Sequence, residues 1–192
     1  MVLALPVHLR KPARPAPLLL HATIAVLGVG AVLGVFAPIA TAHAQPLDRY
    51  TTYKNMLGRS KTQSSVRITI KQLGDYTVEK LESADAEYYY SFAKRGVELH
   101  FDAKHQVSFA VLLNDKAFPS YARYSGSLPA KIAFADDEAA VIKKAGKAEK
   151  TKDIAAVKER VLFYDKKGFS VVLFADGPRK GKIKYIEIYA QK

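Results

Sequence analysis

The sequence predicts an α+β fold in which two tandem helix-plus-antiparallel-meander repeats form one domain. Its 192 residues, 49% hydrophobic and 25% charged, have the length and composition of a globular protein with a substantial core. Short strand-like runs alternate with turn residues, as in antiparallel meanders. Glycines recur 72 residues apart, Gly74 with Gly146 and Gly96 with Gly168, and such spacing indicates an internal duplication. Chance agreement between the halves is the alternative.

The first segment, 1–44, has the pattern of a signal peptide. Three basic residues and no acid precede a run from Pro15 to Leu47 that has no charged residue. Ala42-His43-Ala44 then supplies small residues at the two positions that a signal peptidase reads. We therefore expect export to the periplasm, with cleavage after Ala44. The uncharged run is also long enough to span a bilayer, so an uncleaved anchor is the alternative.

The expected mature domain, 45–192, is basic and has no cysteine. The signal segment holds three of the 30 basic residues and none of the 18 acidic ones, so cleavage lowers the net charge from +12 to +9. Because the chain is expected outside the cytoplasm, we do not expect nucleic acid as its partner. The absence of cysteine excludes disulfides, thiolate metal sites and catalytic thiols.

Repeat one covers about 57–113. A helix is expected over 64–73 because the second half has one at the corresponding place, although Val66, Ile68 and Ile70 alternate as in a strand. Runs rich in aromatic and β-branched residues, which favour strands, predict strands over 87–92, 97–102 and 106–113. Of the three tyrosines 88–90, at least two are expected to pack into the core.

A connecting segment, 114–129, follows. It contains Pro119 and Pro129 but also Tyr121 and Tyr124, so we expect it to pack across the domain and not to act as a flexible linker.

Repeat two covers about 130–190. Asp136-Asp137-Glu138, followed by an apolar run and Gly146, predicts a helix with acids at its start and glycine past its end. Strands are expected over 160–164, 169–174 and 183–189. The lysine-rich stretch 143–158 predicts a solvated helix and loop, and 177–182 a basic hairpin tip.

The run from Tyr124 to Pro129, the helix ending at Gly146, the strand after Gly168 and the closing Ile186-Glu187-Ile188 resemble small exported bacterial proteins made of two α-β repeats. Many of these are encoded beside toxins and are thought to act as immunity proteins. The architecture is similar to that of the secreted β-lactamase inhibitor protein and, for one repeat, to the small lipoprotein of the outer-membrane assembly machine, although a lipobox cysteine is absent. The resemblance implies fold and role, but it assigns no binding residue.

One compact set could bind a metal: His100, Asp102 and His105. Two imidazoles and a carboxylate are ligands for zinc and related ions. The alternative is the polar end of an ordinary hairpin. No nucleophile motif or phosphate-binding loop is present, so we expect a non-enzymatic protein without a cofactor. Glycosidase-type carboxylate pairs remain open because their members come from distant positions.

Outward-facing aromatic and aliphatic residues of the expected sheet, together with the connecting segment, predict a partner-binding surface. The candidate residues are Tyr89, Tyr121, Tyr124, Val161, Phe163, Val172 and Phe174. The alternative is that the connecting segment covers the apolar group in the second half.

We therefore expect an exported protein-binding module, an immunity or inhibitor protein that occludes a secreted toxin or an envelope hydrolase. The alternative is an envelope-maintenance module that binds anionic lipid, lipopolysaccharide or peptidoglycan through its basic charge.

The export prediction is tested by N-terminal sequencing of the protein made in a bacterial host. The expected first residue is Gln45, because the peptidase cleaves after the small residue at position 44. An intact Met1 in the membrane fraction would contradict cleavage and support the anchor.

Overall fold

The computed structural model describes residues 49–81 and 87–191, which belong to one compact unit, Ala44–Lys192. The predicted signal segment and its cleavage site lie outside the described residues. Within the described ranges, no helix has the length and apolar character needed to cross a membrane.

The elements follow a helix-then-strands order in each half of the chain. The helices are α1 (Tyr50–Lys54), α2 (Ser64–Leu73) and α3 (Glu138–Ala145). The strands are β1 (Thr77–Leu81), β2 (Glu87–Phe92), β3 (Val97–Phe101), β4 (Val107–Leu113), β5 (Lys150–Ile154), β6 (Glu159–Tyr164), β7 (Phe169–Phe174) and β8 (Ile183–Tyr189).

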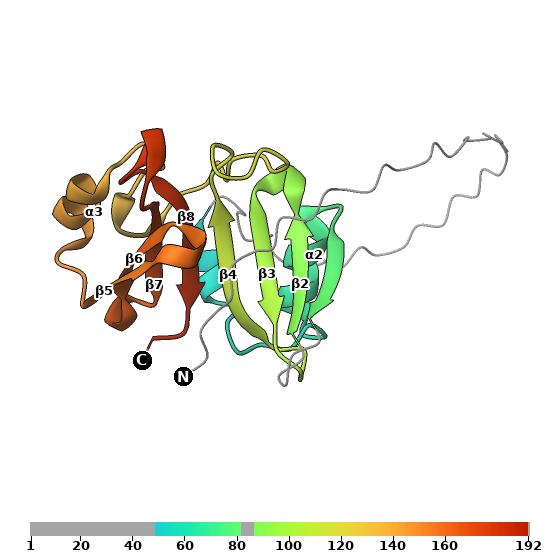
Figure 1. Cartoon of the computed structure of the whole chain (residues 1–192). Helices are drawn as coiled ribbons and strands as arrows, with labels where there is room; N and C mark the ends of the chain where they lie inside the picture. The colour runs from blue at the N-terminus through green and yellow to red at the C-terminus, as the bar shows by residue number, and fades with distance from the viewer. Residues whose placement is uncertain (1–48, 82–86, 192) are drawn as a thin grey trace, which may run out of the picture. The chain divides into compact units, whose positions relative to one another are not determined.

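The eight strands of the described residues form one antiparallel sheet in the order β1-β2-β3-β4-β8-β7-β6-β5 (Figure 1). Each half contributes a four-stranded meander, and the last strands of the two meanders, β4 and β8, pair with each other. The predicted α+β class is therefore confirmed, and the predicted helix over 64–73 is present.

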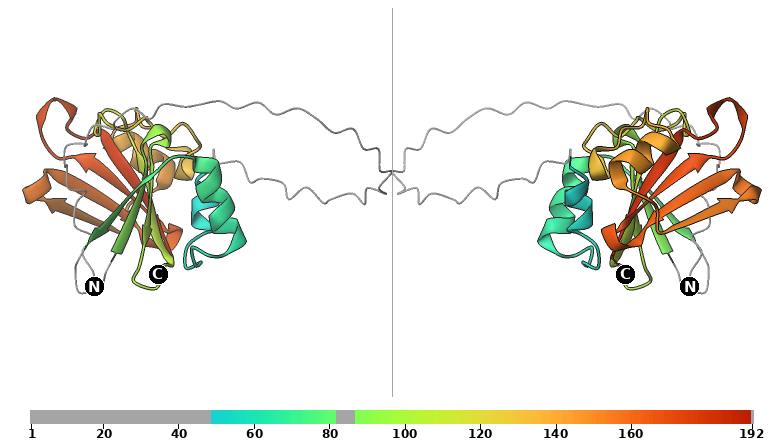
Figure 2. Two further views of the ribbon diagram at one scale, coloured as in Figure 1. Left: turned by 90° about the vertical axis from the view of Figure 1, so that its right-hand side faces the viewer. Right: turned by 90° about the vertical axis from the view of Figure 1, so that its left-hand side faces the viewer.

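The three helices cover the same face of the sheet (Figure 2). Tyr53 from the segment α1, Val66 from α2 and Val141 from α3 are completely buried there, in one core cluster with Leu99 and Val171 from the central strands. The opposite face, which the helices do not cover, is called the open face below. Because strand residues alternate between faces, the strand register assigns every strand residue to one of the two.

The start and end of α3 follow from its sequence. Asp137 is the N-cap, and its side chain accepts a hydrogen bond from the backbone of Ala140 at 3.0 Å. Glu138 adds an acid in the first turn, and Gly146 follows the last turn with a positive φ of 84°. Both predictions for this helix are confirmed.

Three elements were not predicted. Sequence analysis gave no strand for β1, no helix for α1, and a solvated helix and loop where β5 lies. The strands β1 and β5 are the edges of the sheet and expose charged residues such as Glu79 and Lys150. Charged residues protect an edge from pairing with other chains, but they hide the alternation that identifies a strand.

The connecting segment 114–129, expected to pack across the domain, contacts both faces of the sheet. Asn114 donates through Nδ2 to the carbonyl of Ile183 at 2.8 Å, and Phe118 lies against Tyr185 with ring centroids 5.9 Å apart. Tyr124 then enters the helix-side core, edge-on to Tyr53. The segment therefore passes from the open face around the ends of the strands to the helices.

Gly96 follows the turn between β2 and β3 in the left-handed conformation, with φ 64°, and the connecting segment runs directly over it. A Cβ atom at this position would lie 2.5 Å from the backbone nitrogen of Tyr124 and 2.9 Å from the carbonyl carbon of Arg123. Only glycine therefore permits the observed packing.

We expect Gly96→Ala to lower the free energy of unfolding by about 2–4 kcal/mol, since it combines backbone strain with a clash against backbone atoms. Gly181→Ala is the matched control: Gly181 also has a positive φ, 78°, but nothing within 4 Å of an added Cβ. It should cost only about 1 kcal/mol. Equal effects in urea unfolding would show that the close approach at Gly96 is not important.

Candidate functional site

The open face carries a row of four aromatic side chains across the centre of the sheet. Direct strand pairing places Tyr89 of β2 beside His100 of β3, His100 beside Phe109 of β4, and Phe109 beside Tyr189 of β8. The His100 ring lies 4.0 Å from that of Tyr89 and 3.9 Å from that of Phe109, centroid to centroid. We call these four residues the aromatic row.

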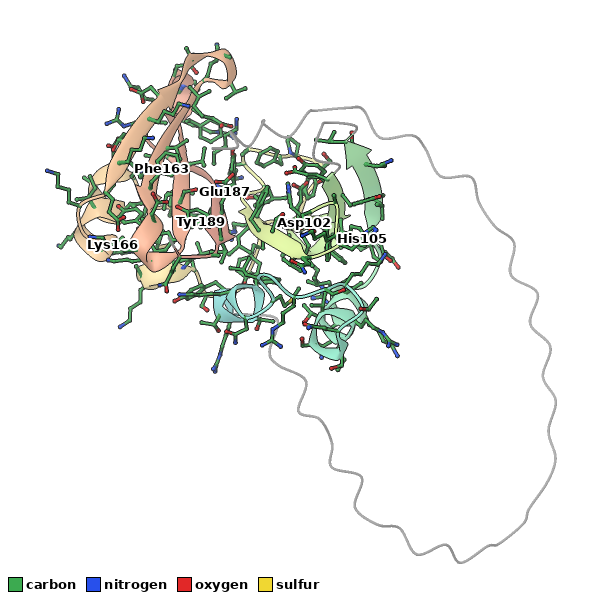
Figure 3. All side chains as sticks on the ribbon, turned by 90° about the horizontal axis from the view of Figure 1, so that it is seen from below. Asp102, His105, Phe163, Lys166, Glu187 and Tyr189 are labelled. Carbon is green, nitrogen blue, oxygen red and sulfur yellow. The ribbon has the colours of Figure 1, made fainter. Side chains whose placement is uncertain are left out.

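A second row, next to the aromatic row on the same face, contains two carboxylates. Pairing continues from Ser91 through Glu98, Val111 and Glu187 to Ser170 and Phe163. We call this the acidic row. Glu187, Tyr189 and Phe163 are labelled in Figure 3.

Glu98 is buried and fully hydrogen-bonded. It accepts from the Tyr121 hydroxyl at 2.6 Å and the Ser91 hydroxyl at 3.2 Å, and its other oxygen lies 3.3 Å from Nε2 of His100. Burial alone would raise its pKa, but these three hydrogen bonds outweigh burial and the pKa is lowered. Glu98 is therefore a structural carboxylate that holds the connecting segment on the open face.

His100 is 2% exposed, and burial lowers its pKa despite the neighbouring Glu98 and the more distant Glu87. A neutral ring with its proton on Nε2 fits the hydrogen bond to Glu98. Its Nδ1 has no hydrogen-bond partner among the residues that the structure describes. An unpaired buried nitrogen costs free energy, so most buried polar atoms in folded proteins are hydrogen-bonded.

Glu187 differs from Glu98 and Glu159, two buried carboxylates of the same face. Within the described ranges it accepts one side-chain hydrogen bond, from the Ser170 hydroxyl at 2.7 Å, and it forms no ion pair with any lysine or arginine. Burial raises its pKa, and the charge of Glu159 raises it further. Glu159 itself is neutralised by Lys184, whose Nζ lies 2.7 Å away, and accepts from Tyr185.

The predicted partner surface of the second half is smaller than expected. Val161 and Val172 do lie side by side on the open face, but they are only 4% and 1% exposed. They cannot offer a partner much area, which corrects that part of the prediction. Phe163 and Phe174 are partly exposed on the same face.

The two candidate tyrosines of the connecting segment lie on opposite faces of the sheet. Tyr121 lies on the open face, where it donates to Glu98, and it is partly exposed. Tyr124 is 5% exposed in the helix-side core, so its assignment to a partner surface is wrong. Of the seven predicted residues, four remain accessible on the open face: Tyr89, Tyr121, Phe163 and Phe174.

The three candidate metal ligands do not converge. His100 lies within the aromatic row, whereas Asp102 accepts two backbone hydrogen bonds, from Lys104 and Gln106, in the turn after β3. His105 stacks on Tyr88, which faces the helix side. No group of three potential metal ligands occurs in the described part of the chain. The contacts of Asp102 and His105 are those of the polar end of an ordinary hairpin, which was the alternative interpretation of this segment.

Phe109, Glu187 and Tyr189 were not among the residues predicted from the sequence. The signal was available in 183–189, where Tyr185, Glu187 and Tyr189 alternate with isoleucines. An acid between two tyrosines on one strand face indicates a surface that is neither core nor ordinary solvent-exposed sheet. The sequence alone could not place β8 beside β4, which brings Phe109 into this row.

Comparison of the chain with protein-family models, with curated proteins and with solved structures finds no significant match.

Acid should destabilise the domain through His100. Its pKa is below that of an unfolded histidine, about 6.5. Its contribution is therefore fully present above that pH and is lost as the pH falls, by at most about 1.4 kcal/mol per pH unit. Glu187 acts in the opposite sense, because its raised pKa favours proton uptake by the folded state.

We therefore expect the unfolding free energy in urea to fall less steeply between pH 7 and 5 in His100→Gln, which keeps an N–H donor but does not titrate, than in the parent. Parallel pH profiles would exclude His100 as the source.

Proposed function

We propose that the chain is an exported, non-enzymatic protein-binding module that occludes its partner, a secreted toxin or an envelope hydrolase. The observation that carries this proposal is a group of partly exposed rings on the sheet face that the helices leave open (Figure 2): Tyr89, Phe109 and Tyr189 of the aromatic row, with Phe163 and Phe174. Exposed aromatic groups of this kind are characteristic of protein interfaces.

The arrangement suits binding by steric occlusion. Tyr89, Phe109 and Tyr189 are held on three hydrogen-bonded strands, so little side-chain freedom remains to be lost on association. The Tyr189 hydroxyl is also fixed by Asp165, at 2.9 Å. Rigid aromatic residues on a preorganised scaffold are frequent hot spots of binding energy.

We also propose that the two halves are tandem repeats. The turns after β2 and β6 end in Gly96 and Gly168, both left-handed and 72 residues apart, and each glycine carbonyl accepts from the final strand of its own half. The irregularities in β3 and β7 pairing, after His100 and Val172, are also 72 residues apart. A duplication accounts for these correspondences and gives each half one part of the open face.

The runner-up function is binding of an anionic envelope component. One observation favours it: Arg179, Lys180 and Lys182 are exposed together in the hairpin tip between β7 and β8. Binding of this type must weaken steeply with added salt, whereas binding through the aromatic row should not.

The proposal is tested by cross-linking the protein to its partner in the producing cells, identifying that partner by mass spectrometry and measuring its affinity. Tyr89→Ala should weaken binding about 10- to 100-fold, as loss of an aromatic anchor does. Tyr76→Ala is the matched control, because Tyr76 is 43% exposed and stacks on Tyr90 of the helix-side core. If the two variants bind alike, the open face is not the interface.

A further inference from the structure

The open face of the first meander is acidic, although the chain as a whole is strongly basic. The outward positions of β1, β2 and β3 carry Glu79, Glu87 and Glu98. Among the outward residues of β1 to β4 that the structure describes there is no lysine or arginine. Glu187 continues the acidic region onto β8, directly beside Val111 of β4.

Glutamates of this region raise the pKa of the same two tyrosines, Tyr89 and Tyr121. Burial raises the pKa of Tyr89, and Glu87, Glu98 and Glu79 raise it further. Burial likewise raises the pKa of Tyr121, with added effects from Glu98 and Glu79. One negative region therefore extends over the first meander and its connecting segment.

The positive charge lies elsewhere. On the open face, Lys150 and Lys152 belong to the opposite edge strand, β5, and Lys184 is engaged by Glu159. The exposed basic hairpin tip between β7 and β8 is likewise in the second half. The net charge of +12 therefore does not describe the surface around the aromatic row.

A second observation concerns His100, at the centre of the aromatic row. His100, 2% exposed and enclosed by Tyr89 and Phe109, leaves Nδ1 without a partner among the described residues. In the neutral tautomer that fits Glu98, this nitrogen is an acceptor. This buried nitrogen and the partly exposed Glu187 carboxylate both have no N–H donor among the described residues, and of the two Glu187 is accessible to a bound molecule.

We propose that the surface formed by the aromatic row with Glu87 and Glu187 binds an arginine-bearing segment of a protein partner, an inference that rests on the proposed function and specifies the chemistry of its interface. A guanidinium stacks on aromatic rings and donates up to five hydrogen bonds in one plane. The rings of Tyr89 and Tyr189 provide the stacking surfaces. Glu187, which has no cation in the described structure, provides the charge-assisted acceptor.

The same features exclude an anionic polymer from this particular surface. Carboxylates repel phosphate and glycan carboxylates, and bringing an anion beside a half-buried Glu187 has no compensating cation nearby. An anionic ligand would have to use the basic hairpin tip or the β5 edge instead.

The probe is a blocked seven-residue peptide of alternating glycine and arginine, titrated into the isotope-labelled protein while backbone amide shifts are recorded. We expect changes centred on Tyr89, His100, Phe109 and Glu187. Glu187→Gln, which keeps the size and the Ser170 hydrogen bond, should weaken binding about fivefold, the loss of one charge-assisted contact. Glu87→Gln, at the residue of β2 that accepts from the Tyr89 hydroxyl, provides a second variant with the same expectation.

Asp176→Asn is the matched control, since it removes one negative charge from an exposed residue that pairs with Lys158; its binding should stay within about twofold of the parent. Three results would overturn the inference: shifts centred elsewhere, equal weakening by the control, or equal binding of the glutamate version of the peptide.

Failure of this inference and failure of the proposed function are distinguishable. If the arginine peptide leaves the aromatic row unperturbed while the captured partner still depends on Tyr89, the cationic specificity is wrong and the binding function stands. If the peptide binds the row but the captured partner is indifferent to Tyr89→Ala, the surface recognises arginine and the proposed role in that complex is wrong.

Discussion

The pairing of β4 with β8 is the constraint on which both the core and the candidate site depend. It joins two four-stranded meanders that are far apart in the sequence into one sheet. On the helix side it places Leu112 opposite Ile186, and on the open face it places Phe109 opposite Tyr189. Because side chains alternate along a strand, a slip of one residue would exchange these faces. Burial of the apolar residues on the helix side therefore also fixes which residues are neighbours on the open face.

The two central carboxylates show how this surface differs from a core. Glu98 has three donors and a lowered pKa, so its charge is balanced within the fold. Glu187 occupies the same row with one hydroxyl donor and a raised pKa. A protein selected only for stability would gain by replacing Glu187 with an apolar residue, because an uncompensated half-buried charge is costly. Retaining such a group is consistent with a ligand that completes it.

The sequence predicted regular elements well where local chemistry determines them. Asp137 and Gly146 delimit α3, and alternation identified the six inner strands. Prediction failed for features that depend on contacts between residues far apart in the sequence. The edge strand β5 reads as a solvated lysine-rich run because no neighbour covers one of its sides. Tyr121 and Tyr124 are three residues apart in an irregular segment and reach opposite faces, a difference that no periodicity encodes.

Net charge and local charge lead to different expectations for a partner. Screening limits interactions between exposed charges to about 8–10 Å at physiological salt, so the ligand proposed for the aromatic row would interact mainly with the acids around it, whereas the basic surface would attract the rest of the partner. A partner that satisfies both has an acidic surface overall and presents an arginine at the point of contact. The lysines of β5 and of the hairpin tip would then contact the rim of such a partner while Glu187 contacts its centre. This arrangement, with long-range attraction and a charge of opposite sign at the core of the interface, favours rapid encounter together with a unique docking register.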